Sequence, residues 1–243
     1  MNSTLIAKDL VKEIKGRLII DHVSFSISSN EIVGLLGPNG AGKTSTFYSV
    51  AGLIQPDQGS VYLDDTKLNG LPLSKRVQMG LGYLPQETSI FTNMTVYENI
   101  LTYIENNKSY KSKENHHETA DHFLKQFDLS LLAQHTAKSL SGGEKRRLEI
   151  ARLMTLKPKF ILLDEPFAGV DPKSINSIKN LIINLSKRYN LGILIIDHNV
   201  HETLNMCDRA YIMHQGKMIA EGNSKDIVNN KDARNVYFGE HWN

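Results

Sequence analysis

Gly37-Pro38-Asn39-Gly40-Ala41-Gly42-Lys43-Thr44 is the stretch that decides the fold of this 243-residue chain. It matches G-x-x-x-x-G-K-[ST], a pattern whose glycines let backbone N–H groups turn inward around anionic oxygens. The apolar run Glu31–Leu36 before it is typical of a buried strand, and Lys43–Leu53 after it has helical character. A strand, a glycine-rich turn and a helix in this order predict a phosphate-binding loop in an α/β sheet.

The loop predicts a site for a triphosphate. Lys43 is expected to reach the β- and γ-phosphates, and Thr44 is expected to supply a hydroxyl to Mg²⁺. A dinucleotide-binding loop is not supported, because the glycine spacing is not G-x-G-x-x-G. The candidate binding residues are Gly37, Pro38, Asn39, Gly40, Ala41, Gly42, Lys43, Thr44 and Ser45.

A second apolar run ends in two carboxylates. Phe160–Leu163 predicts a buried strand, and Asp164 and Glu165 follow at its C-terminal end, where parallel sheets bind ligands. Asp164 is the natural partner of Mg²⁺, through water, and Glu165 is placed to act as a general base on the attacking water. The alternative is that the two carboxylates simply face solvent at the end of a strand. The presence of Lys43 and Thr44 in the same chain strongly disfavours this alternative.

The segment Leu140-Ser141-Gly142-Gly143-Glu144 precedes a predicted helix, Lys145–Leu156. Ser141 and Glu144 have the spacing of a capping box, so a well-capped helix explains these residues without any ligand. The two glycines also leave the helix start open to a phosphate. A two-fold dimer could then place this helix start on the nucleotide of the partner, and the residues alone leave both explanations open.

Composition restricts the class of protein. Apolar residues make up 40% and charged residues 22%, which is ordinary for a globular domain. A net charge of +2 gives no basic field for nucleic acid, and the single cysteine, Cys207, excludes an intrachain disulfide and fits a reducing compartment. The N-terminus is too polar for a signal peptide, and no apolar run approaches the roughly 18–20 residues that span a bilayer. We therefore expect a soluble chain that reaches a membrane only by docking.

The pattern along the chain predicts one α/β domain, residues 1–243, with a helical insertion at about 88–157 and a C-terminal tail at 231–243. The insertion contains the polar loop Asn106–His117. The long amphipathic helix Ser174–Tyr189 lies between two predicted strands, which implies a parallel sheet. The other predicted strands are Leu18–Ile20, Val23–Ile27, Ser60–Leu63, Leu81–Leu84, Lys159–Asp164, Leu191–Asp197 and a hairpin of Ala210–Met213 with Met218–Ala220.

These motifs, with Gln86 and Asp197-His198, resemble in order and spacing the ATP-binding subunit of ABC transporters over essentially the whole chain. The five-residue segment Leu140–Glu144 is the most specific part of that resemblance. It implies an α/β fold: a P-loop NTPase (RecA-like) core with a mainly parallel sheet, an N-terminal antiparallel β subdomain and an inserted α-helical subdomain.

The resemblance also implies an ATPase with ATP and Mg²⁺ as ligands and a homodimer that closes around two ATP molecules. Gln86 looks like the glutamine that senses Mg²⁺ and faces the transmembrane partner, and Asp171 looks like an aspartate of the dimer interface. Ser141 and Gly143 would touch the partner's γ-phosphate. The implied catalytic residues are Lys43, Glu165 and His198, and the implied metal-site residues are Thr44, Gln86 and Asp164.

Two other classes of protein agree less well with the sequence. A soluble ABC protein of translation or DNA repair usually needs two cassettes or a long coiled coil, for which 243 residues leave no room. A small P-loop kinase has no use for Leu140–Glu144 or for a histidine at position 198.

The segments between the motifs resemble, within the family, the ATPases that power lipopolysaccharide export from the inner membrane. This resemblance implies two transmembrane permease subunits as partners, no nucleic acid, and a peripheral location on the cytoplasmic face of the inner membrane. The ATPases of branched-chain amino-acid uptake share much of the same pattern and remain the alternative. The segments are Tyr83–Phe91, Asp164–Asp171, Asp197–Val200 and Val236–Glu240.

Three further features of the sequence lead to predictions. Ile14 stands where the family usually has an aromatic residue that stacks on adenine, so adenine contact is expected to be weaker. Phe91 and Met94 either line a groove for a coupling helix of the membrane partner or pack between core and insertion. The tail aromatics Tyr237, Phe238 and Trp242 are expected to pack back on the domain, with a dimer contact as the alternative.

Overall fold

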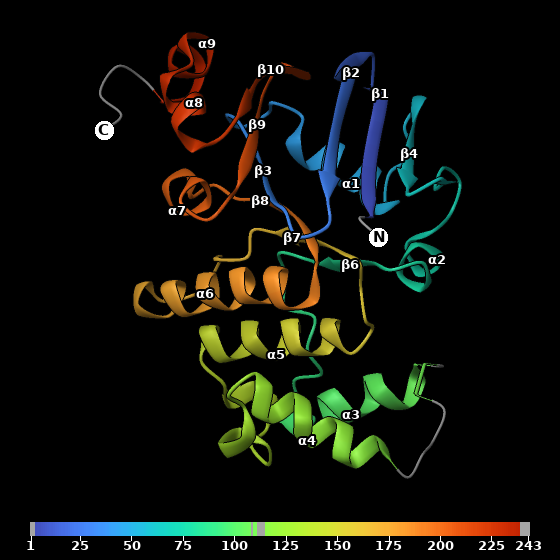
Figure 1. Ribbon diagram of the computed structural model, residues 1–243, viewed down its shortest axis with the longest axis vertical. Helices are drawn as coiled ribbons and strands as arrows, with labels where there is room; N and C mark the ends of the chain where they lie inside the picture. The colour runs from blue at the N-terminus through green and yellow to red at the C-terminus, as the bar shows by residue number, and fades with distance from the viewer. Residues whose placement is uncertain (1–2, 108, 111–114, 239–243) are drawn as a thin grey trace.

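The computed structural model describes residues 3–107, 109–110 and 115–238. The strands lie mainly in the upper part of the molecule in Figure 1, and the helices of residues 96–189 form its lower part. The fold is the α/β arrangement that the motifs predict. Within the described residues, no helix combines the length and apolar character that crossing a bilayer requires.

The central sheet has six strands in the order β10-β9-β3-β8-β7-β6. All neighbours are parallel except β9 and β10, which form the predicted hairpin. Every residue of β3, β7 and β8 is buried, as expected of parallel strands covered on both faces. The strands are β3 Ile32–Leu36, β6 Leu81–Leu84, β7 Phe160–Asp164, β8 Gly192–Ile196, β9 Arg209–His214 and β10 Lys217–Gly222.

A second sheet of four antiparallel strands has the order β2-β1-β4-β5, and its bounds are β1 Thr4–Ile14, β2 Arg17–Ser28, β4 Gln58–Leu63 and β5 Thr66–Lys67. The sequence pattern missed β1, and it divided β2 into two strands. The reason is local irregularity: register shifts follow Ala7 and Leu10, and Asp9 and His22 have φ of 53° and 55°. Such bulges break the alternation of apolar and polar residues by which strands are recognised.

The helices are α1 Lys43–Ala51, α2 Leu73–Gln78, α3 Val96–Asn106, α4 His116–Gln126, α5 Gly142–Met154, α6 Pro172–Tyr189, α7 Val200–Leu204, α8 Ser224–Asn229 and α9 Lys231–Ala233. Helix α5 begins three residues before the predicted start, because Ser141 caps it. Helix α4 begins at His116, inside the predicted loop Asn106–His117, and part of that loop lies outside the described residues.

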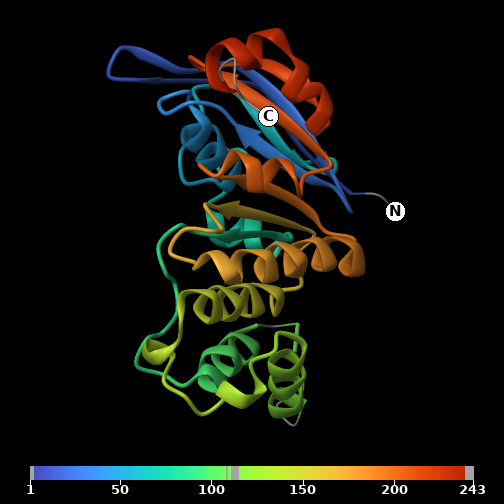
Figure 2. The same cartoon turned by 90° about the vertical axis from the view of Figure 1, so that its left-hand side faces the viewer.

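Side chains of the parallel strands alternate between two cores. Ile193 and Ile195 of β8 point to the cluster shared with α5 and α6, whereas Leu194 and Ile196 point to the cluster shared with α1 and the antiparallel sheet. Figure 2 shows this layering, with α6 and α5 stacked beneath the parallel strands. The parallel sheet is therefore sandwiched, and the carboxyl ends of its strands are held rigidly.

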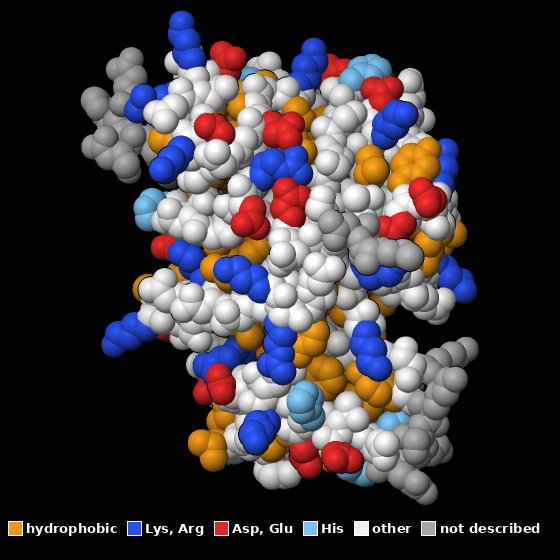
Figure 3. All heavy atoms as spheres, in the orientation of Figure 1, with side chains coloured by type: hydrophobic (Ala, Val, Ile, Leu, Met, Phe, Trp, Pro, Cys, Tyr) orange, Lys and Arg blue, Asp and Glu red, His pale blue; other side chains and the backbone are white. Residues whose placement is uncertain are grey.

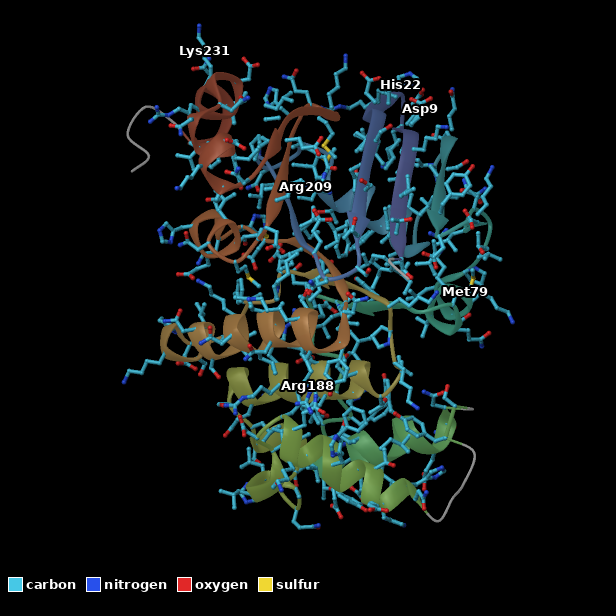
Figure 4. All side chains as sticks on the ribbon, in the orientation of Figure 1. Asp9, His22, Met79, Arg188, Arg209 and Lys231 are labelled. Atoms are coloured by element: carbon cyan, nitrogen blue, oxygen red, sulfur yellow. The ribbon has the colours of Figure 1, made fainter. Side chains whose placement is uncertain are left out.

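Hydrogen bonds and side-chain packing connect the C-terminal part of the chain to the two sheets. Arg209 of β9, labelled in Figure 4, donates to the Ser26 carbonyl of β2 at 2.8 Å and pairs with Glu31 at 2.8 Å. Phe238 is buried with Leu36 and Ile212, and Tyr237 packs against the same cluster. These two tail aromatics pack on the domain, and Trp242 lies outside the described residues.

Candidate active site

The glycine-rich loop connects β3 to α1. Gly37, Gly40 and Gly42 all have positive φ, between 76° and 146°. At Gly37 a Cβ atom would lie 2.1 Å from the Met213 carbonyl oxygen of β9, so any side chain would displace the neighbouring strand. The glycine at position 37 is therefore required by the close approach of β9, and the loop has the glycine-rich backbone of an anion-binding nest.

Lys43 is the first residue of α1 and is 7% exposed. Its Nζ donates to the Gly37 carbonyl at 2.7 Å and to the Pro38 carbonyl at 3.0 Å. Burial lowers the pKa of Lys43, and the Glu165 carboxylate acts in the opposite direction. The ammonium group is therefore held inside the loop by its own carbonyls, while Thr44, on the next position, is exposed.

The carboxylates lie where β7 ends. Asp164 closes the strand and is 3% exposed, and burial raises its pKa. Glu165 has φ of 46°, in the left-handed region, and its N–H donates to the Ile196 carbonyl of β8 at 2.8 Å. A left-handed conformation costs a residue other than glycine about 1–3 kcal/mol, and it turns Glu165 out of the strand.

Gln86 and His198 meet at Glu165. Gln86 Nε2 donates to Glu165 Oε2 at 2.7 Å, and His198 Nε2 lies 2.7 Å from Glu165 Oε1. The three residues come from the ends of β6, β7 and β8, which are adjacent in the sheet. The topology thus joins three predicted site residues that lie far apart in the sequence.

Asp197 stabilises the segments that carry Glu165 and His198 through hydrogen bonds. It is buried, which raises its pKa, and its carboxylate accepts from the N–H of Asn199 at 2.7 Å. A second, longer bond of 3.4 Å comes from the N–H of Phe167. Asp197 therefore connects the segment that carries His198 to the segment that carries Glu165.

The donor set suits Mg²⁺ that arrives with a nucleotide. Thr44, Gln86 and Asp164 offer only hard oxygen ligands, and Mg²⁺ is usually held by one or two carboxylates together with substrate phosphates. Among the described residues, no group of three or more His, Cys, Asp or Glu side chains forms a metal cage of its own. These residues thus fit a metal whose remaining ligands are phosphates and water.

Ser141 and Gly143 lie at the start of α5. Ser141 Oγ and its backbone N–H both donate to Glu144 Oε2, at 2.7 and 2.8 Å, so the predicted capping box forms. These hydrogen bonds lower the pKa of Glu144. Within the described residues, no hydrogen bond or ion pair links Ser141 to Gly37–Ser45. One copy of the chain therefore does not bring the two predicted phosphate-binding elements together.

Sequence reasoning missed a buried ion pair beneath the site. Arg146 Nη1 and Glu149 Oε2 of α5 are 2.9 Å apart, and both side chains are almost fully buried. The Arg146 guanidinium also donates to four carbonyls, those of Pro85, Asp164, Glu165 and Pro166. The spacing of Arg146 and Glu149, three residues apart on a helix, was the signal available in the sequence. The same spacing occurs equally well in exposed ion pairs on a helix surface.

Two tyrosines at the site were also missed. The Tyr83 hydroxyl lies 3.4 Å from Asp164 Oδ2, and the Tyr48 side chain lies next to the same carboxylate and to Tyr83. They lie on β6 and α1, so their meeting at Asp164 depends on tertiary packing.

Comparison with known proteins identifies the family. The family model for ABC transporters matches residues 20–168. The chain is 50% identical over 240 residues to the lipopolysaccharide export system ATP-binding protein LptB of Haemophilus influenzae, and the match covers 99% of each chain.

Solved structures agree. An ATP-binding cassette of an ABC transporter in its ADP conformation has a TM-score of 0.86 and 29% identity, over 98% of this chain and 99% of that one. A dimeric bacterial ABC transporter cassette has a TM-score of 0.78 and 25% identity, over 90% of this chain and 98% of that one. The chain therefore belongs to the ABC transporter family, as an ATP-binding and ATP-hydrolysing subunit of the LptB type.

Proposed function

We propose that this chain is the ATPase of a lipopolysaccharide exporter, docked on the cytoplasmic face of the inner membrane through two permease subunits of the LptF and LptG type. The observation that carries the proposal is the 50% identity to an LptB protein over 99% of both chains. Three of the residues that the sequence pattern assigns to the site, Gln86, Glu165 and His198, are in contact, which supports the proposal.

The proposed reaction is in-line attack of water on the γ-phosphate of ATP. Glu165 accepts the proton of the attacking water, and Lys43 and His198 stabilise the negative charge that spreads over the γ-phosphate. Thr44, Gln86 and Asp164 would hold Mg²⁺, which supplies neutralisation of phosphate charge when bound. Gln86 and His198 each contact one oxygen of Glu165 and leave further lone pairs of the carboxylate for the attacking water.

The proposed active unit is a homodimer. Ser141 and Gly143 stand at the start of α5, Ser141 is exposed, and within the described residues neither is hydrogen-bonded to the phosphate loop of its own chain. A dimeric cassette is among the solved structures that this fold resembles. Two ATP molecules would each be bound between the loop Gly37–Ser45 of one copy and the α5 start of the other.

Coupling to the permeases is proposed to run through the segment from Gln86 to Phe91. Ser89 N–H and the Thr88 hydroxyl donate to Glu149, whose partner Arg146 holds the backbone at Asp164 and Glu165. A shift of this segment is therefore transmitted to the backbone of the catalytic carboxylates through a continuous chain of hydrogen bonds.

A pocket of about 640 Å³ adjoins that segment and supports a docking role. Phe91 is 42% exposed and lies 6.4 Å from the ring of Tyr103, and Arg152 stacks over both rings. Figure 3 shows the molecule hollowed between α2 and the lower helices. Met94 is not among the residues that line this pocket, and its carbonyl accepts from the N–H of Ala137. The pocket is lined by Val77, Gln78, Phe91, Thr102, Tyr103, Asn106, Asn107, Ser109 and Leu156.

The test of the proposed cargo is purification of the tagged chain from membranes of its own host, followed by mass spectrometry of the membrane subunits. Two permeases of the lipopolysaccharide-export type are expected. The purified complex should then release lipopolysaccharide from proteoliposomes when ATP is added. Recovery of branched-chain amino-acid permeases instead would refute the assignment.

Phe91→Ala should leave the ATPase activity of the free subunit within about twofold of wild type and weaken assembly with the permeases. The side chain is exposed in the groove and does not touch the triad at Glu165. Copurification yield and ATPase rate are the measurements, and Leu131→Ala, at a site 96% exposed, is the control. A fall in melting temperature of the free subunit would show that Phe91 serves packing instead.

Ile14→Tyr should tighten ATP binding by about tenfold, since base–aromatic stacking is worth about 1–3 kcal/mol. Ile14 is the last residue of β1 and is 39% exposed, so a larger ring can be accommodated. Titration with a fluorescent ATP analogue measures the change. Leu18→Tyr, on the facing strand and equally open to solvent, should have no effect. An unchanged dissociation constant for Ile14→Tyr would exclude a stacking position at residue 14.

A further inference from the structure

Asp164 lies next to the phenol groups of two tyrosines, one on a strand and one on a helix. Tyr83 of β6 places its hydroxyl 3.4 Å from Asp164 Oδ2. The Tyr48 side chain of α1 lies beside both groups, with its ring edge to face against that of Tyr83, so the three groups lie at the corners of a triangle. Each phenol has one hydrogen to donate, and the carboxylate is the acceptor that can use both.

The triangle is fixed by ring packing. The rings of Tyr48 and Tyr83 meet edge to face with centroids 6.5 Å apart. Phe47, which is fully buried, lies 6.4 Å from Tyr48 and 6.1 Å from Tyr83. This packing fixes where the two hydroxyl oxygens lie relative to Asp164.

The triangle connects the three elements that carry the proposed metal-site residues. Tyr48 is one turn of α1 beyond Thr44, Tyr83 is three residues before Gln86, and Asp164 ends β7. A change in the angle of any one element would therefore pull on the other two through hydrogen bonds to a single carboxylate.

We infer that Tyr48 and Tyr83 are positioning residues that orient the Asp164 carboxylate toward the metal ion bound with the nucleotide. The inference rests on the proposed metal role of Asp164 and deepens it. Groups that hydrogen-bond a metal-ligating side chain set its direction, and their removal typically weakens metal binding by 10–100-fold. Neither tyrosine needs to contact the metal or the nucleotide for this effect.

The experiment compares Tyr48→Phe, Tyr83→Phe and the double variant with wild type. Each protein is saturated with a non-hydrolysable ATP analogue, and the Mn²⁺ concentration that half-saturates it is measured by electron paramagnetic resonance. The double variant should need about tenfold more Mn²⁺, and each single variant less than that, because the remaining phenol still holds the carboxylate. Affinity for the same analogue in EDTA should stay within twofold of wild type.

Two reference variants make the result specific. Tyr110→Phe removes another half-buried phenol, one that donates to the Thr155 carbonyl at 2.9 Å away from the site, and it should leave Mn²⁺ binding unchanged. Asp164→Asn should raise the Mn²⁺ requirement more than the double variant does. Melting temperatures identify any variant that is unfolded. If the double variant is unfolded, the single variants decide whether the tyrosines position Asp164.

The outcomes separate the inference from its foundation. If Asp164→Asn weakens Mn²⁺ binding but neither tyrosine variant does, the positioning role is wrong and the metal role of Asp164 stands. If Asp164→Asn itself binds Mn²⁺ like wild type, the metal role fails, and the inference fails with it. An equal loss of analogue affinity in EDTA would mean that the tyrosines act on the phosphate loop instead.

Discussion

Glu165→Gln should slow ATP hydrolysis by roughly 10²–10⁴ while ATP binding is retained, because the amide cannot accept the proton of the attacking water. The substitution keeps the shape of the side chain, so Gln86 and His198 can still contact it. With hydrolysis blocked, ATP should accumulate between two copies and hold them together. Phosphate release measures the rate, and light scattering after size exclusion measures the dimer with ATP and Mg²⁺ present.

Two controls decide how that result is interpreted. Glu105→Gln changes an exposed carboxylate on α3, far from the triad, and should match wild type in rate and mass. Ser141→Arg added to Glu165→Gln should abolish the ATP-dependent dimer, because the bulky side chain blocks the α5 start. Retained turnover in Glu165→Gln would require a different base. A monomer in ATP would remove the basis for the proposed sandwich.

Arg146→Met should lower the free energy of unfolding by about 3–5 kcal/mol, the typical cost of leaving a buried charge without its partner. The substitution removes the guanidinium from four backbone carbonyls and leaves the Glu149 carboxylate buried. At about 2–4 °C per kcal/mol for a chain near this size, the melting temperature should fall by about 10 °C. Calorimetry measures this shift.

A double-variant cycle tests the cause of that loss. Arg146→Met with Glu149→Leu should be more stable than Arg146→Met alone, because the unpaired carboxylate is gone. Lys145→Met, at the neighbouring and less buried position of α5, should have little effect. Strictly additive losses in the double variant would show that the ion pair does not couple the two residues.

The sequence predicted those parts of the fold whose signal is local. Glycines at 37, 40 and 42, the Ser141 cap and the fully apolar strands follow from backbone conformation, capping and burial, which act over a few residues. Strand β1 was missed because its bulges break the alternation that a strand pattern requires. Phe91 lines the pocket and Met94 does not, because proximity in the sequence does not place two side chains in the same pocket.

By itself the sequence determined the phosphate loop, the capped start of α5 and the identity of each candidate site residue, since these depend on residue type and short spacing. Only the tertiary structure decided which groups meet. Parallel packing of β6, β7 and β8 brings Gln86 and His198 to Glu165, and stacking of α1 on the sheet brings Tyr48 to Asp164. The physical reason is that these contacts join strand ends that are adjacent in the sheet but distant in the chain, and strand order is not encoded in local pattern.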